Sequence, residues 1–202
     1  MNKGVVWVAF GKKAQKEAAL SKTSFLKHNR ASTRVFKELS FPSPEGLSVK
    51  QQAHWAKVNV DKWSPYKHTL MLDADTRIKG DLSLGFQMLV KGWEMVMVPS
   101  VPNYAGERPF WHLSEPERIE TLKELGTGLH VMFNTGVIFF KRTKAVQTLF
   151  EAWRSEWLRF KEWDQGAFLR ALRKHPVNLW LLGSPFNSRG GEVVNHLFGR
   201  AR

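Results

Sequence analysis

Apolar and polar residues alternate along the first part of the chain in blocks typical of short buried strands separated by amphipathic helices. β-Branched and aromatic residues fill 5–10, and apolar residues at helical spacing follow over 13–27. A second strand is expected over 33–39, a second helix over 51–63 and a third, strongly apolar strand over 70–72. Because strands and helices alternate, the pattern predicts an α/β unit with a parallel sheet.

The rest of the chain continues this alternation less regularly. Helices are expected over 81–89, 117–125, 143–163 and 164–173, and strands over 94–98, 130–140 and 177–182. The apolar stripe of 143–163 indicates a core-facing helix. Residues 130–140 are interpreted as two strands broken at Asn134-Thr135-Gly136, since glycine allows a tight turn or a close backbone approach. Asp164 is placed as a helix N-cap, and the proline-rich segment 99–116 as a long loop, a lid or acceptor-facing surface.

Length and composition limit the classes of protein. A chain of 202 residues with 43% hydrophobic residues fits one globular domain and excludes a disordered protein. The absence of cysteine excludes disulfides and thiolate metal sites. Because the N-terminal apolar run over 4–10 is too short for a signal peptide or a spanning helix, no transmembrane segment is expected. The expected address is the cytoplasm, with peripheral contact at the inner membrane face left open.

The charge balance points to anionic partners. The sequence has 31 Lys and Arg against 18 Asp and Glu, a net charge of +13, which attracts nucleotides, nucleic acid or the phosphate-rich face of a membrane. The basic residues are spread along the chain, and no common nucleic-acid-binding motif is present. A non-catalytic module that binds polyanions or nucleic acid stays open. A nucleotidyltransferase is a second alternative, although no glycine-rich triphosphate loop follows the first strand.

Two acidic residues follow the third predicted strand. Asp73 and Asp75 flank Ala74 directly after the apolar run. Ligands of open α/β sheets bind outside the carboxyl ends of the strands, so both carboxylates are expected to face a cleft. Mg²⁺ and Mn²⁺ prefer such oxygen ligands and leave positions for water and phosphates. Asp is also common where strands end in turns, so the tripeptide alone supports a metal site or an ordinary turn.

Four short motifs in order carry a resemblance to a known family. They are Leu72-Asp73-Ala74-Asp75-Thr76, Phe133-Asn134-Thr135-Gly136-Val137, Asp164-Gln165 and His196-x-x-Gly199. Over 5–202 the chain resembles the nucleotide-sugar-dependent glycosyltransferases of the GT-A fold, above all family 8, the group of glycogenin and bacterial lipopolysaccharide galactosyl- and glucosyltransferases. The resemblance implies a Rossmann-like, mainly parallel central sheet flanked by helices. It also implies a single catalytic domain, with a nucleotide-binding half over 1–75 and a sugar and acceptor half over 76–202.

The implied activity is the metal-dependent transfer of a hexose from a nucleoside diphosphate sugar, with UDP as the expected nucleotide, to an acceptor hydroxyl with retention. By position, the resemblance implies that Asp73, Asp75 and His196 hold Mn²⁺ or Mg²⁺. Imidazole is a normal ligand for ions such as Mn²⁺, and the cation would neutralise the departing diphosphate. Gly199 and Arg202 fall where the family holds the phosphates, although Arg replaces the family's Lys and changes the geometry.

The resemblance assigns the remaining donor contacts as well. The base would lie against Ala9, Phe10 and Gly11, and Ala74 lies between the two acidic ligands. Lys57 falls on the helix from which the family often sends a basic residue to the donor, although a helical lysine is usually solvated. Asn134 corresponds to a contact on the sugar or acceptor side, with a strand-end turn as the alternative.

Asp164 and Gln165 match the pair that lies against the donor sugar, Asp164 at its hydroxyls and Gln165 near the anomeric carbon. An inverting enzyme would need a general base, for which Asp164 is the candidate. Two departures leave specificity open: Gly11-Lys12-Lys13 replaces an acidic residue and a Tyr at the base, and Gly166 replaces an acidic residue after Gln165. The acceptor is expected to be a glycan or another phosphate-bearing polyanion.

Overall fold

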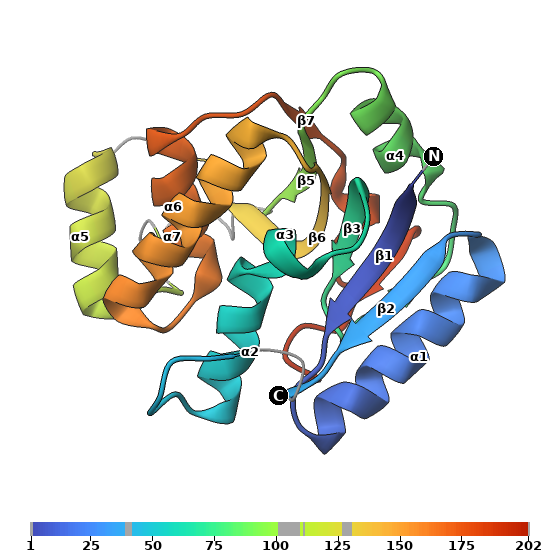
Figure 1. The fold of residues 1–202 in the computed structure, drawn as a ribbon, viewed down its shortest axis with the longest axis horizontal. Helices are drawn as coiled ribbons and strands as arrows, with labels where there is room; N and C mark the ends of the chain where they lie inside the picture. Colours follow the sequence, from blue (N-terminus) through green and yellow to red (C-terminus); the bar gives the residue numbers. More distant parts are fainter. Residues whose placement is uncertain (1, 39–41, 101–109, 111, 127–130, 202) are drawn as a thin grey trace.

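The structure is a computed structural model that describes residues 2–38, 42–100, 110, 112–126 and 131–201. The strands are β1 Lys3–Val8, β2 Ser32–Phe36, β3 His68–Leu72, β4 Thr76–Ile78, β5 Met95–Pro99, β6 Phe133–Lys141, β7 Leu179–Leu181 and β8 Val194–His196. The helices are α1 Lys12–His28, α2 Val49–Val58, α3 Val60–Trp63, α4 Ser83–Val90, α5 Glu115–Leu125, α6 Lys144–Phe160, α7 Asp164–Lys174 and the short 3₁₀ helix η2 Ser184–Phe186. Figure 1 shows their arrangement.

The central sheet has six strands in the order β2-β1-β3-β6-β5-β7. Neighbouring strands are parallel except where β6 runs antiparallel to β3 and β5. The sheet is therefore mixed and mostly parallel, as predicted. Because Leu72 at the end of β3 pairs with both Trp7 and Val137, the carboxyl ends of β1 and β3 meet the beginning of β6 at one edge.

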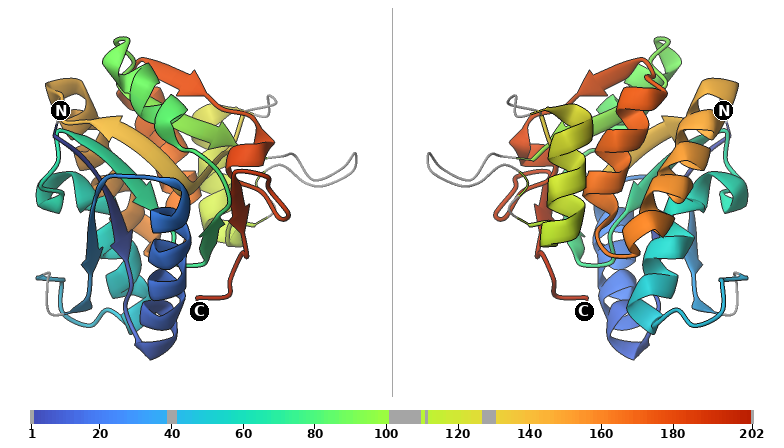
Figure 2. Two further views of the ribbon diagram at one scale, coloured as in Figure 1. Left: turned by 90° about the vertical axis from the view of Figure 1, so that its right-hand side faces the viewer. Right: turned by 90° about the vertical axis from the view of Figure 1, so that its left-hand side faces the viewer.

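Two hydrophobic clusters cover the two faces of this sheet. Val6 and Met71 face one cluster with side chains from α2, α3, α5, α6 and α7, and their neighbours Val5 and Leu70 face the other cluster with α1 and α4. Figure 2 shows these two helical layers from opposite sides. The apolar stripe of α6 is buried in the first cluster, which confirms the expected core-facing helix.

The prediction of two strands over 130–140 is wrong for the described residues, because β6 runs without a break from Phe133 to Lys141. The irregularity lies in its pairing with β5, where the register shifts between Met97 and Val98. The Asn134 side chain accepts a hydrogen bond from the Gly136 amide at 2.9 Å and so supports this irregular stretch.

Two helix boundaries and one pair of strands also differ from the expectation. The helix expected over 51–63 is divided at Asn59 into α2 and α3. The helix expected over 143–163 ends at Phe160, because Lys161 adopts a left-handed conformation with φ 57° and ψ 31°. The sequence also gave no indication of the antiparallel pair formed by β4 and β8.

Some expectations are not tested by the described residues. Most of the proposed lid, 101–109 and 111, lies outside them, although α5 begins at Glu115, inside the segment expected to be a loop. The division into two functional halves at residue 75 stays a prediction. Among the described residues, none of the helices has both the length and the apolar character needed to cross a bilayer.

Candidate active site

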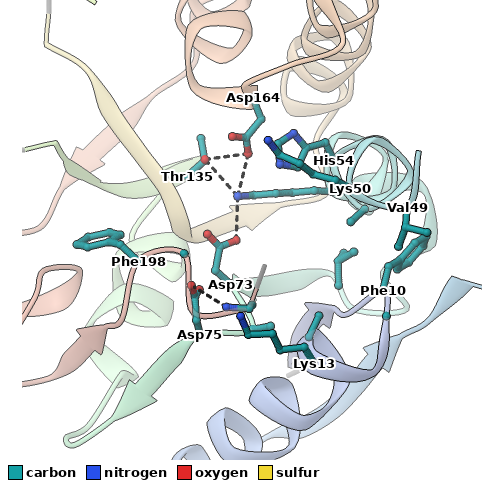
Figure 3. Close-up of a pocket in the computed structure, with 18 of the residues that line it drawn as sticks. Phe10, Lys13, Val49, Lys50, His54, Asp73, Asp75, Thr135, Asp164 and Phe198 are labelled. Carbon is teal, nitrogen blue, oxygen red and sulfur yellow. Dashed lines mark hydrogen bonds and ion pairs between the residues drawn. The ribbon is translucent and has the colours of Figure 1, made fainter. Parts of the chain in front are cut away.

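A cavity of about 510 Å³ opens at the sheet edge where β1 and β3 end (Figure 3). Most residues chosen from the sequence line it: Phe10, Gly11, Lys57, Asp73, Ala74, Asp75, Asn134, Asp164, Gln165, His196 and Gly199. Ala9 is fully buried in the core beside it, and its amide donates to the Phe36 carbonyl at 2.9 Å. Arg202 lies outside the described residues. The structure thus brings these side chains together, while their roles stay predictions.

Backbone pairing brings the three predicted metal ligands to one point. The Asp73 amide donates to the Gly136 carbonyl at 2.8 Å, which fixes the end of β3 against β6. Thr76, directly after Asp75, pairs with His196 in the antiparallel β4–β8 ladder. As a result, His196 Nε2 lies 3.2 Å from an Asp75 oxygen and 3.7 Å from an Asp73 oxygen.

The donor set fits a divalent cation such as Mn²⁺ or Mg²⁺. Asp73, Asp75 and His196 each offer one ligand atom, and these atoms lie within 4.8 Å of one another. Two carboxylates and an imidazole are suitable ligands for Mn²⁺. Gly136 leaves the space for them, since a Cβ there would lie 2.3 Å from His196 Cε1 and 2.9 Å from an Asp73 oxygen. Glycine at this position therefore serves close packing within the site and not a chain reversal.

Asp75 is held in its charged form. Burial alone would raise the pKa of its carboxyl group, but the His196 imidazole and the Ala201 amide lower that pKa well below its usual value. The Leu197 amide also donates to the Asp75 backbone carbonyl at 2.9 Å. The chain after β8 therefore lies directly against this carboxylate.

Lys57 connects the metal side of the cavity with the start of α7. Its ammonium nitrogen lies 2.8 Å from an Asp73 oxygen, 2.8 Å from an Asp164 oxygen and 3.2 Å from the Thr135 hydroxyl. In Figure 3 the labelled side chains of Asp73, Thr135 and Asp164 lie around the point where dashed lines meet. Burial lowers the pKa of Lys57, but the Asp164 and Asp73 carboxylates raise it above its usual value. This helical lysine is therefore buried and paired, not solvated.

Asp164 is not the N-cap that the sequence predicted. It is the first residue of α7, and Trp163 occupies the N-cap position without a side-chain hydrogen bond. The Asp164 carboxylate instead accepts from the Thr135 hydroxyl at 2.9 Å and binds Lys57. Although burial raises the pKa of this carboxyl, Lys57, His54 and Thr135 lower it well below its usual value.

Sequence reasoning missed His54 and Thr135, which also line the cavity. His54 lies one helical turn before Lys57 on α2, so helical spacing around Lys57 would have found it. Its Nδ1 lies 2.5 Å from the Glu162 carbonyl and must carry the proton, since a carbonyl only accepts. Burial lowers the pKa of His54. Thr135 was inside the Asn134 motif but had been interpreted only as part of a break.

Carboxylates from other elements lie near both departures from the family pattern. At the end of β1, the Gly11 amide donates to Glu38, and Gln15 donates to the same carboxylate at 3.0 Å. The Gly11 hydrogen bond is the main reason that the pKa of Glu38 is lowered. After Gln165, a Cβ on Gly166 would lie 2.8 Å from a Glu117 oxygen. Gly11 and Glu38, like Gly166 and Glu117, are too far apart in the sequence for a short motif to connect them.

Comparisons with known proteins identify similar structures but no similar sequences. No protein-family model matches the sequence, and no curated protein matches it. Mouse xyloside xylosyltransferase 1 superposes with a TM-score of 0.65 at 11% identity, over 100% of this chain and 99% of that chain. Galactosyltransferase LgtC, in complex with donor and acceptor sugar analogues, gives 0.61 at 13% identity, over 97% and 87%. The bifunctional glycosyltransferase WbbM gives 0.66 at 13% identity, over 98% of this chain and 46% of that chain. The chain has a mixed sheet with flanking helices and superposes on these enzymes over nearly its whole length. It therefore has the GT-A glycosyltransferase fold.

Proposed function

We propose that this protein is a metal-dependent glycosyltransferase that moves a hexose from a nucleoside diphosphate sugar, with UDP as the nucleotide, to an acceptor hydroxyl. The observation that carries the proposal is one cavity with two chemical ends. Asp73, Asp75 and His196 gather their ligand atoms at one end, and Asp164 and Gln165 line the same cavity. Sugar transfer from an activated diphosphate needs a charge-neutralising end and a hydroxyl-binding end within reach of each other.

At the diphosphate end, Asp73, Asp75 and His196 would hold Mn²⁺ or Mg²⁺. When bound, the cation supplies Lewis-acid stabilisation of the charge that develops on the leaving diphosphate. Lys13 and Gly199 line the same cavity and add a side-chain cation and backbone groups for the phosphates. Phe10 and Gly11 at the end of β1 supply an apolar ring and backbone groups for the base.

At the sugar end, the Asp164 carboxylate accepts hydrogen bonds from sugar hydroxyls, and Gln165 lies near the anomeric carbon. The lowered pKa of Asp164 makes it a weak proton acceptor at neutral pH, because a general base works best with a pKa near the working pH. Among the predicted site residues, Asp164 was the one candidate base for an inverting reaction. Retention at the anomeric carbon is proposed because the resemblance to family 8 implies it.

The test is to incubate the purified protein with a panel of nucleotide sugars and Mn²⁺ and to measure nucleoside diphosphate release. We expect release with at least one donor, its loss on chelation, and its loss in the variant that combines Asp73→Asn with Asp75→Asn. A nucleotidyltransferase would instead release pyrophosphate from a nucleoside triphosphate. The absence of both donor turnover and donor binding with every member of the panel would overturn the proposal.

The acceptor is proposed to be a glycan or another polyanion that carries phosphate. Lys12, Lys13 and Lys50 line the same cavity, in a protein with a net charge of +13. Such cations favour anionic ligands and make binding fall with salt. Anionic binding that is unchanged by Asp73→Asn with Asp75→Asn, in a protein without turnover, would favour the non-catalytic binding module.

The cytoplasmic location stays a proposal, and the same positive charge underlies the proposed peripheral contact at the inner membrane face. Cosedimentation with anionic but not with neutral vesicles tests the membrane contact. Absence of cosedimentation at low salt would contradict it.

A further inference from the structure

We propose that Asn187 is a positioning residue that fixes the tautomer and ring orientation of His196, so that the imidazole presents Nε2 as a cation ligand. The proposal rests on the metal site of the proposed function and adds a residue that no sequence motif indicated. It concerns the side of His196 that faces away from the two carboxylates.

Asn187 bridges two parts of the site that are remote in sequence. Its side chain follows η2 and is buried, with 4% of the residue exposed. One end of the amide lies 2.8 Å from His196 Nδ1, and the other donates to the Asn134 backbone carbonyl at 3.3 Å. Asn187 therefore joins β6 to the imidazole on β8.

These two contacts together settle which groups donate. The Asn134 carbonyl can only accept, so the NH₂ group of Asn187 must face it. The side-chain oxygen of Asn187 must then face His196, and because this oxygen can only accept, Nδ1 must carry a proton. The tautomer follows from the hydrogen-bond network without any assumption about the metal.

Protonation at Nδ1 leaves Nε2 with a lone pair whenever the imidazole is neutral. Nε2 lies 3.2 Å from an Asp75 oxygen and 3.7 Å from an Asp73 oxygen. Three electron-pair donors this close together repel unless a positive charge lies among them, and that charge is either a proton on Nε2 or a bound cation. The Asn187 contact thus prepares His196 for a cation, because a metal-binding histidine usually donates its other ring N–H to a polar partner that fixes the orientation of the ring.

The backbone around Asn187 is held without its side chain. The His196 amide donates to the Ser188 carbonyl at 3.0 Å, and the Asn187 amide donates to the Ser184 carbonyl at 3.0 Å. Ser188 also forms a β-bridge with Asn195. Removal of the Asn187 amide group should therefore affect the imidazole more than the path of the chain.

The test compares Asn187→Leu, which keeps the shape and removes both polar contacts, with the unmodified protein. The ¹⁵N chemical shifts of the His196 ring in the metal-free protein report its tautomer. We expect a clear Nδ1–H signature in the unmodified protein and a mixture of tautomers in Asn187→Leu. Manganese affinity, followed by electron paramagnetic resonance of free Mn²⁺, should fall about 10- to 100-fold.

Two further variants separate positioning from general disturbance. Asn195→Ala alters the same loop, where the Asn195 side chain accepts from the Gly190 amide at 2.9 Å, but does not touch the imidazole. We expect it to keep the tautomer and the Mn²⁺ affinity. Asn187→Asp retains an acceptor for Nδ1–H, so it should keep most of the Mn²⁺ affinity.

An unchanged tautomer in Asn187→Leu would overturn the proposal, as would an equal loss of Mn²⁺ affinity in Asn195→Ala. The readouts also distinguish this inference from the proposed function. In one outcome the unmodified protein shows the Nδ1–H tautomer, Asn187→Leu loses it, and the unmodified protein binds no Mn²⁺. The metal site then fails, and with it the role of Asn187 toward a cation. If Mn²⁺ binds equally well to Asn187→Leu, only the positioning role fails.

Discussion

The ammonium group of Lys57 lies 2.8 Å from the Asp164 carboxylate, in an ion pair that is almost completely buried. The same ammonium group binds Asp73 on the metal side at 2.8 Å. A single cation on α2 thus compensates the lost hydration of the buried Asp164 carboxylate, and it also binds Asp73, whose side chain is 30% exposed. The proposed metal end and the proposed sugar end of the cavity are therefore electrostatically linked in the protein itself.

Replacement of Lys57 should destabilise the fold as well as the site. Lys57→Met leaves buried Asp164 without its cation, and breaking a buried pair in this way costs about 3–5 kcal/mol. Urea unfolding followed by tryptophan fluorescence measures the change in the free energy of unfolding. Lys16→Met, at an exposed position of α1, is the matched control and should change little. Equal stability of the two variants would contradict the buried ion pair.

Replacement of Asp164 should separate the sugar from the nucleotide. Asp164→Asn keeps the shape and removes the charged acceptor, and a hydrogen bond to a charged group contributes about 1.5–3 kcal/mol. We expect nucleotide-sugar affinity to fall about 10- to 100-fold, which is the ratio that corresponds to this energy. Affinity for the nucleoside diphosphate alone should fall less, through the weakened Lys57 ion pair that also holds Asp73. Isothermal titration with both ligands measures the two affinities. A parallel loss for both ligands would contradict a sugar-specific contact.

A methyl group at Gly136 should disrupt the metal site while most of the fold remains. In Gly136→Ala the new Cβ would lie 2.3 Å from His196 Cε1, so the imidazole must move away from Asp73 and Asp75. We expect at least about 10-fold weaker Mn²⁺ binding, the lower end of the effect of misplacing a ligand. Gly80→Ala is the control, because its Cβ would meet Val193 at an ordinary 3.5 Å. Unchanged Mn²⁺ affinity in Gly136→Ala would show that His196 is not a ligand.

Stability should depend on pH through Glu156, a residue of α6 whose carboxylate binds Arg170 and Lys174 of α7. Burial raises the pKa of Glu156, but hydrogen bonds from Lys174, Arg170 and Arg159 hold it at about 2, below the usual 4.5. A carboxyl whose pKa is lowered by folding stabilises the protein above its unfolded pKa and loses this contribution as the pH falls through the folded pKa. The contribution of Glu156 should therefore be complete above pH 5 and decline toward pH 2.

Free energies of unfolding measured between pH 7 and pH 2 test whether the contribution of Glu156 declines as the pH falls. Glu156→Gln should be less stable than the unmodified protein at pH 7, and the difference should narrow as the pH falls toward 2. Glu151→Gln, at an exposed position of the same helix, provides the control and should show a much smaller difference. A difference between Glu156→Gln and the unmodified protein that does not vary with pH would contradict the lowered pKa.

Much of the layered architecture followed from local pattern. The continuous apolar runs of β1 and β3 indicate strands that are buried on both faces. The stripe of α6 reports its buried face directly, because side-chain direction in a helix repeats every 3.6 residues. The acidic pair at the end of β3 could be placed at the ligand-binding edge by the same local reasoning. Boundaries such as Asn59 and Lys161 could not, since they depend on backbone conformations that these residue types do not require.

By itself, the sequence determined most of the order of strands and helices, much of the core and the candidate motifs of the site. Tertiary structure decided how those motifs meet. The β4–β8 ladder brings His196 to Asp75, Lys57 links Asp73 with Asp164, and Asn187 reaches His196 and the Asn134 carbonyl. The physical reason is range: periodicity records which face of an element is buried, whereas ion pairs and hydrogen bonds between distant segments form only after the sheet has brought them together.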